Sequence, residues 1–482
     1  MADTAPIPLV VDLDGSLAST NTLHESVIKL IRSSPLHLLF LPFWLLRGRA
    51  KVKDAIACRT VLAADRLPYN ESLLAYLRYE KKKGRRIILA PAAHAKIAAG
   101  VSEHLALFDQ VLATEPGRNL EGTAKLAAIR EKVGEEFVYA GNSAADTPIW
   151  RAAKRAILVG VPPKLAASIR GQVPIEREFP SNGVDLRLWL RAIRAHQWLK
   201  NLLIFVPVLT AFSFLNLAKV EYALVGFLAF SLAASATYII NDLWDLESDR
   251  AHVRKRRRPF ASGEISIAYG IAFVTFAIPA AFALALAVSY EFSAMLGIYL
   301  VLTTAYSWLL KEHVLVDVLV LSMLYTLRIL AGSVACGIKM SSWLVAFSAF
   351  MFLSLALVKR CSELKVLEQG GLSITRGRDY RVSDLGVLWP LGVGAALSAV
   401  VIFGLFINAP ETQARYATPD ALWLVALGLV YWVARLWIKT SRGEMNDDPL
   451  IYAIKDRSCL FTTFWMIITV LSAHFLSLKA LL

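Results

Sequence analysis

The sequence predicts a multidomain chain: an α/β domain with a doubly wound sheet, then an all-α polytopic membrane domain with about nine transmembrane helices. Two observations predict this arrangement. Apolar runs near the length that a bilayer requires occur only after residue 198. Before residue 190, short β-rich apolar runs alternate with helical stretches, as in a parallel sheet covered on both faces. We therefore expect an α/β domain over 1–171, a linker over 172–189 and a membrane domain over 190–482.

The composition agrees with a membrane protein that carries a soluble domain. Of the 482 residues, 56% are hydrophobic, and the formal net charge is +14. The basic residues cluster beside the apolar runs, where anionic membrane lipids and phosphorylated substrates are the expected partners and nucleic acid is not. The four cysteines are scattered, so we expect neither a disulfide framework nor a zinc site. We also expect no cleavable signal peptide, because Met1–Pro8 has no basic region before an apolar core.

Four apolar runs in the first domain are predicted strands: Ile7–Val11, Arg86–Ala90, Phe137–Ala140 and Ala156–Val159. Helical stretches lie between them, so the loops that follow the strands should meet at one edge of a parallel sheet. Between the first two strands, the range 34–49 holds an apolar run that is too short to span a bilayer. We expect a helix on the membrane surface there, with burial against the α/β core as the alternative.

Two acids follow the first predicted strand, in the run Asp12-Leu13-Asp14-Gly15-Ser16. This run resembles the opening motif of haloacid dehalogenase-like phosphatases. The resemblance implies that Asp12 attacks phosphorus and that Asp14 donates a proton to the leaving oxygen. Lys125 is similar to the phosphate-holding lysine of that family, and Asp146 to the carboxylate that holds a metal ion together with Asp12.

Two positions depart from the phosphatase pattern. Pro91, followed by two alanines, stands where a Ser or Thr usually donates a hydrogen bond to the phosphate. Asn142 stands where the last motif usually has an aspartate. Both an active phosphatase and a degenerate scaffold or regulatory module therefore remain open for this domain.

Nine apolar runs are predicted to span the membrane. They are Leu199–Phe214, Tyr222–Ile240, Ile265–Val288, Phe292–Leu310, Val314–Val334, Ser342–Val358, Val387–Ile407, Ala421–Trp437 and Leu460–Leu478. If the amino-terminal domain is cytoplasmic, the loops on its side hold most of the Lys and Arg residues, as the positive-inside rule requires. We expect a multi-pass protein of a bacterial inner membrane, with its amino-terminal domain and active sites in the cytoplasm.

Acidic residues gather at the end of the second predicted span, in the run Asn241-Asp242-Leu243-Trp244-Asp245-Leu246-Glu247-Ser248-Asp249. If the helix continues, Asn241, Asp245 and Asp249 share one face, with Asp242 on its flank. Such a face repels itself unless a cation fills it. Mg²⁺ suits it, because this ion combines few carboxylates with waters and substrate phosphate oxygens. The run therefore predicts Mg²⁺-assisted departure of a diphosphate at a membrane.

The nine spans, the acid run and the segment Gln197-Trp198-Leu199-Lys200-Asn201 resemble the UbiA-type intramembrane prenyltransferase superfamily, over about residues 190–482. Most members that prenylate aromatic rings carry a second D-x-x-x-D motif after the sixth span. This sequence has Lys359-Arg360-Cys361-Ser362-Glu363-Leu364 there, followed by Arg376, Arg378 and Tyr380. That pattern is similar to the decaprenyl-phosphate phosphoribosyltransferase branch.

The resemblance implies phosphoribosyl diphosphate as the donor and a polyprenyl phosphate as the acceptor. The acid run would hold Mg²⁺ on the diphosphate, while a separate cationic group would hold the other phosphate of the donor. The residues assigned to the donor are Lys359, Arg360, Glu363, Arg376, Arg378 and Tyr380. Lys200, Arg258 and Lys311 are candidates for the acceptor phosphate, with snorkelling at the membrane interface as the alternative, and Asn201 is assigned to substrate binding.

Two ionisable residues lie inside the fifth predicted span. Asp317 and Arg328 are eleven residues apart, which is three helical turns, so they share one face. Ionisable groups within a span usually face the interior of a helix bundle. We expect both to line the substrate cavity, with an ion pair to a neighbouring helix as the alternative.

The leading hypothesis is transfer of 5-phosphoribosyl to a polyprenyl phosphate, followed by removal of the 5-phosphate in the amino-terminal domain. One alternative is an aromatic polyprenyltransferase of quinone or haem biosynthesis with a non-catalytic amino-terminal domain. The other is a membrane scaffold in which neither site turns over. The sequence leaves the prenyl chain length and a homo-oligomeric state open.

Overall fold

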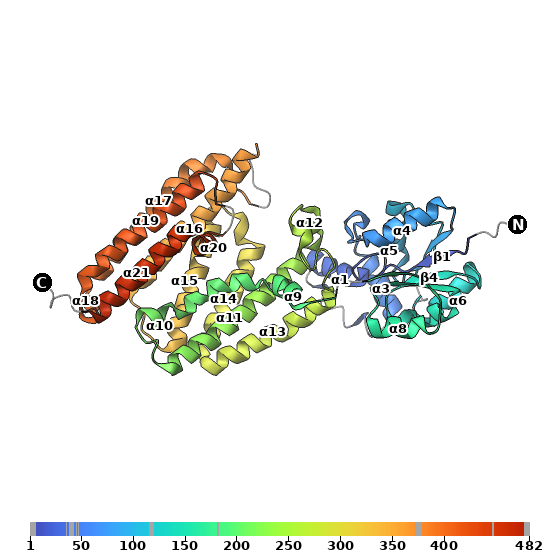
Figure 1. Cartoon of the computed structure of the whole chain (residues 1–482), viewed down its shortest axis with the longest axis horizontal. Coiled ribbons are helices and arrows are strands. Elements are labelled where there is room, and N and C mark those ends of the chain that lie inside the picture. Colours follow the sequence, from blue (N-terminus) through green and yellow to red (C-terminus); the bar gives the residue numbers. More distant parts are fainter. Residues whose placement is uncertain are drawn as a thin grey trace. The chain divides into compact units, whose positions relative to one another are not determined.

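The computed structural model describes residues 6–34, 36–37, 43–44, 46, 48–114, 120–180, 183–371, 378–445 and 448–476 (Figure 1). The chain divides into two compact units. The first comprises Met1–Ala195 and Tyr238–Phe276, and the second comprises His196–Thr237 and Ala277–Leu482. The acid run therefore belongs to the same compact unit as the α/β fold, which the predicted domain boundary near residue 190 did not anticipate.

The first unit contains a six-stranded parallel sheet in the order β3-β2-β1-β4-β5-β6. Its strands are β1 (Leu9–Val11), β2 (Ile87–Leu89), β3 (Gln110–Val111), β4 (Val138–Gly141), β5 (Arg155–Val159) and β6 (Ile175–Phe179). The four predicted strands are found in β1, β2, β4 and β5. The prediction of a linker over 172–189 is wrong where β6 lies, because three polar residues at the centre of this edge strand hide its strand pattern.

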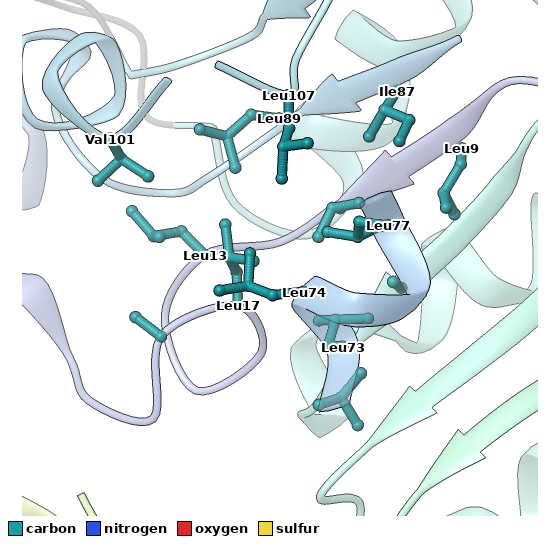
Figure 2. Close-up of a cluster of buried hydrophobic side chains, with 14 of the residues drawn as sticks. Leu9, Leu13, Leu17, Leu73, Leu74, Leu77, Ile87, Leu89, Val101 and Leu107 are labelled. Atoms are coloured by element: carbon teal, nitrogen blue, oxygen red, sulfur yellow. The ribbon is translucent and has the colours of Figure 1, made fainter. Parts of the chain in front are cut away.

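Helices cover both faces of this sheet (Figure 1). On one face, α4 (Glu71–Lys82) and α5 (Ala95–Leu105) bury Leu77 and Val101 against Leu9 and Leu89 (Figure 2). The other face is covered by α6 (Thr123–Lys132), α7 (Thr147–Ala152) and α8 (Pro163–Arg170). Alternate residues of β1 serve the two faces, since Val10 packs with the second group of helices.

The topology places a crevice at the carboxyl end of β1. This strand pairs with β2 on one side and with β4 on the other, so the strand order reverses there. Ligands of open α/β sheets bind at such a switch point. Asp12 follows β1 directly and Asn142 follows β4, and thus the sheet brings the predicted phosphatase-like residues to one edge.

Seven of the described helices are long and apolar enough to cross a membrane. They are α11 (Leu217–Trp244), α13 (Ile267–Val288), α15 (Val316–Cys336), α16 (Ser342–Gln369), α17 (Leu385–Ile407), α19 (Leu422–Ser441) and α21 (Arg457–Phe475). A further predicted span corresponds to α14 (Tyr290–Trp308), which is not among these seven. The chain is thus a multi-pass membrane protein, but the predicted count of nine spans is not confirmed.

The first predicted span, Leu199–Phe214, is wrong as a single helix. The range holds most of a 3₁₀ stretch, η3 (Ala195–Phe205), followed by the five-residue α10 (Val206–Thr210). Pro207 in the first turn of α10 suits a helix start rather than a helix interior. Gly332 of α15 lets η3 pack closely, because a Cβ there would lie 2.1 Å from the Ile204 carbonyl oxygen.

Most of the range 34–49, predicted as a membrane-surface helix, lies outside the described residues. Trp44 is described and packs against a small cluster formed by Leu30, Val52 and Ile56. Leu30 belongs to α1 (Thr22–Ser33), and the other two belong to α3 (Arg49–Ala57).

Candidate functional site

The predicted acid run forms a helix break rather than one continuous helix. α11 ends at Trp244 and α12 spans Leu246–Ala251, with Asp245 between them at φ −100° and ψ 13°. The Asp245 amide still donates to the Asn241 carbonyl oxygen over 3.0 Å, and the Asp249 amide donates to the Asp245 carbonyl oxygen over 2.8 Å. The i to i+4 backbone bonds thus persist across the break.

Asp242 and Asp249 share one arginine. A terminal nitrogen of Arg258 lies 3.1 Å from Asp242 Oδ1 and 2.6 Å from Asp249 Oδ2. Arg194 also donates to Asp242 Oδ1, over 2.5 Å. Both carboxylates are buried, with side chains 3% and 1% exposed. Arg258 therefore belongs to the acid cluster. Arg194 was not predicted, and only its nearness to the segment 197–201 could have suggested it.

The acid cluster fits a divalent cation. Asp249 Oδ1 is buried and has no hydrogen-bond partner. Burial raises the pKa of Asp249 above its ordinary value, although Arg258 opposes this rise. Among the described residues no three acidic, His or Cys side chains are gathered tightly enough to hold a metal by themselves. Two carboxylates completed by waters and phosphate oxygens nevertheless match the way Mg²⁺ is usually bound.

A cavity of about 430 Å³ lies at the carboxyl end of β1 in the α/β fold. It collects all four residues predicted for the phosphatase-like site: Asp12, Asp14, Lys125 and Asp146. The Asp14 carboxylate accepts a hydrogen bond from the Thr22 amide over 2.8 Å, at the start of α1. The cavity is thus built by the sheet edge and the first turn of one helix.

Hydrogen bonds connect these residues in a chain. Lys125 Nζ donates to Asp12 Oδ1 over 2.7 Å and to the Tyr139 hydroxyl over 3.1 Å. The Tyr139 hydroxyl donates to Asp146 Oδ1 over 2.8 Å. Burial raises the pKa of Asp12 to about 6, although the Lys125 ammonium opposes the rise. Tyr139 was not predicted, because in the sequence it is indistinguishable from a core residue of β4.

Of the two departures from the phosphatase pattern, Asn142 lines this cavity, and the other, Pro91, directly precedes two residues that line it. Ala92 and Ala93, after Pro91, line it where a hydroxyl donor was expected. The Ala92 carbonyl oxygen accepts hydrogen bonds from Lys53 Nζ over 2.7 Å and from Thr114 Oγ1 over 3.0 Å. Asn142 Oδ1 accepts a hydrogen bond from Ser16 Oγ over 3.3 Å.

In the second unit, two lysines converge on one carboxylate. Lys200 Nζ lies 2.8 Å and Lys359 Nζ lies 3.9 Å from Asp448 Oδ2. Burial alone would raise the pKa of Asp448, but the two ammonium groups outweigh it and hold the pKa below its usual value. The pair of lysines leaves an excess positive charge. Asp448 was not assigned a role, although it lies in an acidic run just before Pro449.

A separate buried network joins α15 and α16. Arg360 Nε donates to Asp317 Oδ2 over 2.5 Å, and its side chain is 1% exposed. Asp317 also accepts from the Tyr380 hydroxyl, and Arg360 also pairs with Glu363. The structure therefore shows Asp317 in the ion pair with a neighbouring helix. Arg360 is buried in that pair, which leaves little of it for a phosphate.

Arg378 differs from Arg360 in its exposure. Its terminal nitrogen lies 2.8 Å from Glu363 Oε2, and its side chain is 26% exposed. Lys359 is 36% exposed. These two cations, with Lys200, can reach a ligand in a way that Arg360 cannot.

The remaining assigned residues serve different places. Arg328 Nε donates to Asn201 Oδ1 over 2.9 Å, and Asn201 Nδ2 donates to Ser231 Oγ over 3.0 Å. These bonds tie η3 to α15 and α11 inside the bundle. Lys311 lies in a short 3₁₀ turn, η5 (Leu310–Glu312), and is partly exposed. Arg376 lies outside the described residues.

Long apolar helices with charged side chains buried at their ends define a multi-pass membrane protein with polar sites at helix termini. Residues 202–452 match the UbiA prenyltransferase family. This range covers more than half of the chain, and it holds the acid cluster except for Arg194. The chain belongs to the UbiA prenyltransferase family.

Similar proteins include one that resembles nearly the whole chain. It is the uncharacterized protein y4nM of Sinorhizobium fredii, 38% identical over 462 residues, which are 94% of this chain and 89% of that protein. A decaprenyl-phosphate phosphoribosyltransferase of Mycobacterium tuberculosis is 35% identical over 279 residues, 56% of this chain and 88% of its own. A solved UbiA homolog from Archaeoglobus fulgidus, bound to GPP and Mg²⁺, has 17% identity and a TM-score of 0.46, covering 59% of this chain and 99% of its own.

We predict that Asp317→Asn destabilises the membrane bundle. The variant removes the buried partner of Arg360 and leaves only the partly exposed Glu363 to balance its charge. Breaking a buried pair costs about 3–5 kcal/mol when no partner remains, which is the upper bound here. The melting temperature of the purified protein in detergent should therefore fall by several degrees. Asp420→Asn is the control, because Asp420 is exposed in a turn before α19. Equal melting temperatures for the two variants would contradict a stabilising role for the Asp317 pair.

Proposed function

We propose that this chain transfers 5-phosphoribosyl from phosphoribosyl diphosphate to a polyprenyl phosphate in a Mg²⁺-dependent reaction. The observation that supports this most is the cationic character of the site around Lys359 of α16, which Lys200 reaches from η3. Lys200 and Lys359 share a single carboxylate there. A second Mg²⁺ on an isoprenoid diphosphate would require acids at this place, whereas a sugar phosphate requires cations. The 35% identity to a decaprenyl-phosphate phosphoribosyltransferase points the same way.

In this proposal the acid cluster serves the leaving diphosphate. Asp242 and Asp249 would hold Mg²⁺, and the bound ion would lower the charge on the leaving group as the C1–O bond breaks. Arg258 and Arg194, which now balance the two carboxylates, would be able to turn toward the diphosphate oxygens. Arginine suits this task because its planar fork matches two phosphate oxygens at once.

The cations of the second unit would hold the 5-phosphate of the donor. Lys200, Lys359 and Arg378 are the partly accessible members of that group. Arg360 would act only by fixing α16 against α15, since it is buried with Asp317.

The acceptor needs little chemical activation. Its phosphate oxygen is already an anion at neutral pH, so no strong base is required. The work of the protein is to align two anions that repel each other and to stabilise the charge that develops on the leaving group. The reaction would take place at the cytoplasmic boundary of a bacterial inner membrane, where both substrates can meet.

The α/β fold would then remove the 5-phosphate from the lipid product. The support is the convergence of Asp12, Asp14, Lys125 and Asp146 on one cavity. Asp12 would attack phosphorus as a carboxylate and form an aspartyl phosphate, while the bond from phosphorus to the ribose 5-oxygen breaks and Asp14 protonates that oxygen. Water would then hydrolyse the aspartyl phosphate and release inorganic phosphate. Lys125, 2.7 Å from Asp12, would hold a phosphate oxygen. Asp12 and Asp146 would be the protein ligands of a metal ion that balances the phosphate charge.

The test of the transferase proposal is an assay with radiolabelled phosphoribosyl diphosphate, Mg²⁺ and a polyprenyl phosphate, followed by lipid extraction. We predict labelled lipid from the wild type and a loss of at least about 100-fold in turnover for Asp249→Asn, or roughly 3 kcal/mol in transition-state stabilisation. Glu264→Gln, an exposed carboxylate in the same unit, is the control. Failure to label lipid, together with prenylation of an aromatic acceptor, would establish the alternative reaction instead.

A second prediction separates the two substrates. Lys359→Ala and Arg378→Ala should each raise the KM for phosphoribosyl diphosphate about tenfold or more, with a smaller effect on the lipid KM. Their side chains are assigned to a phosphate of the donor alone. Lys365→Ala, on the same helix and paired with Glu368, is the control. Equal increases in both KM values would overturn this assignment.

A third prediction concerns the α/β fold. Asp12→Asn should accumulate the phosphorylated sugar lipid without slowing its formation, because the proposed nucleophile is lost while the transferase residues are untouched. Thin-layer chromatography of the labelled lipids, with and without added phosphatase, measures both products. If the wild type and Asp12→Asn both stop at the phosphorylated lipid, the α/β fold is not a phosphatase of this product.

A further inference from the structure

Two adjoining cavities in the first unit lie beside the acid run and are not used by either proposed reaction. The larger, about 440 Å³, is bounded by residues of α1, the turn near Arg66 and the start of α12. The smaller, about 170 Å³, lies between α1 and the membrane helices α11 and α13. Both are lined by Ile28, Leu243 and Trp244, so the two cavities adjoin at these three residues, and we call them together the groove.

Ion pairs fix the walls of the larger cavity. Both terminal nitrogens of Arg250 donate to the Glu25 carboxylate, over 2.8 and 2.7 Å, and the two side chains are 7% and 4% exposed. One turn further along α1, Lys29 Nζ lies 2.5 Å from Glu247 Oε1. These contacts hold α1 against α12. They also neutralise both carboxylates that line the cavity.

The charge that remains on the cavity wall is positive. Arg32 donates to the Trp244 carbonyl oxygen over 3.2 Å, and this neutral partner leaves its charge uncompensated. Arg66 lies 3.9 Å from Asp65, but both side chains are largely exposed and water screens such a pair. Two guanidinium groups at one cavity favour a phosphate, which can accept two hydrogen bonds from each.

The smaller cavity has the opposite character. Besides the shared residues, its lining consists of Ile31, Ile240, Ile271, Val274 and Thr275, so it offers almost only hydrocarbon surface. Ile240 belongs to α11 and Ile271 to α13, two of the helices that can cross a membrane. A single narrow apolar groove suits one hydrocarbon chain, whereas an ordinary diacyl phospholipid carries two.

We propose that this groove binds an isoprenoid phosphate, with the chain between α1, α11 and α13 and the phosphate at Arg32 and Arg66. This inference rests on the proposed function, in which such a lipid is the acceptor and its glycosylated form is the product. Thr22 and Ser26 of α1 line the Asp12 cavity, while Ile28 and Arg32 of the same helix line the groove. From Thr22 to Arg32, α1 rises about 15 Å. A lipid held in the groove is thereby retained close to the Asp12 cavity between the two reactions.

The test uses a photoactivatable isoprenyl monophosphate with the full-length protein in detergent, and peptide mapping of the cross-links. We expect cross-links to peptides that contain α1 and the facing ends of α11 and α13. The double variant Arg32→Glu/Arg66→Glu should reduce these cross-links about fivefold or more, because a charge reversal repels the phosphate. Ile271→Trp, which fills the apolar groove, should reduce them as well. Arg130→Glu, an exposed arginine on α6, is the matched control and should change nothing.

Cross-links that are unchanged in the double variant, or that avoid these peptides altogether, would overturn the proposal. Unlabelled isoprenyl phosphate should compete with the probe and reduce the cross-links. If phosphatidylglycerol or inorganic phosphate reduced the cross-links equally well, an isoprenoid phosphate would not be the specific occupant. The measurement requires no turnover. A protein that forms the cross-link but never labels lipid with phosphoribose would refute the proposed function while leaving the groove in place. Labelled lipid without the cross-link would refute the groove alone.

Discussion

The ion pairs of Arg258 with Asp242 and Asp249 are the interaction on which the acid segment depends. Two buried carboxylates seven residues apart repel each other in a region of low dielectric, and an arginine between them removes the repulsion. The same arrangement leaves Asp249 Oδ1 without a hydrogen-bond partner, although Lys255 Nζ lies 3.9 Å from it. The segment is therefore electrostatically balanced by arginine, and it keeps one carboxylate oxygen that no hydrogen bond occupies.

The cations of the second unit differ in how deeply they are buried. Arg360 is enclosed with Asp317 and holds two helices together, whereas Lys359, the neighbouring residue, is 36% exposed beside Asp448. Adjacent residues of a helix point about 100° apart, so one faces the bundle and the other faces a polar boundary. Two adjacent cations in the sequence thus become one buried arginine within an ion pair and one partly exposed lysine.

The α/β fold and the acid segment are physically coupled within one compact unit. Glu25 of α1 and Arg250 of α12 form a buried bidentate pair, and α1 begins at the cavity that holds Asp12 and Asp14. Removing either charge of such a pair would leave the other buried and unpaired. The α/β fold therefore stabilises the position of α12 through this ion pair, and this role does not depend on catalysis in its own cavity. The similarity to the Sinorhizobium fredii protein over 94% of the chain indicates that both parts occur together in that relative too.

Sequence alone determined the features that depend on local pattern. Apolar runs in the sequence predicted four of the six strands and eight of the long helices. Acidic residues that directly follow an apolar run predicted the residues gathered at the carboxyl end of β1. The sequence missed β3, which has two residues, and β6, whose polar centre conceals an edge strand. The sequence also predicted one membrane span over Leu199–Phe214. Hydropathy does not distinguish an α-helix from the 3₁₀ stretch η3, which packs closely against Gly332.

Only the tertiary structure decided which partner each charged residue would find. Asp317 could have lined a cavity, but Arg360 lies beside it across two helices. Arg258 was assigned to an acceptor phosphate, and the fold pairs it with two carboxylates. Arg194 carries no pattern of its own, and Asp448 lies in an acidic run that was assigned no role, yet packing places each in a charged cluster. The reason is that a charge in a low-dielectric interior must be compensated by whatever group the fold brings within a few ångströms, and sequence spacing does not encode that distance.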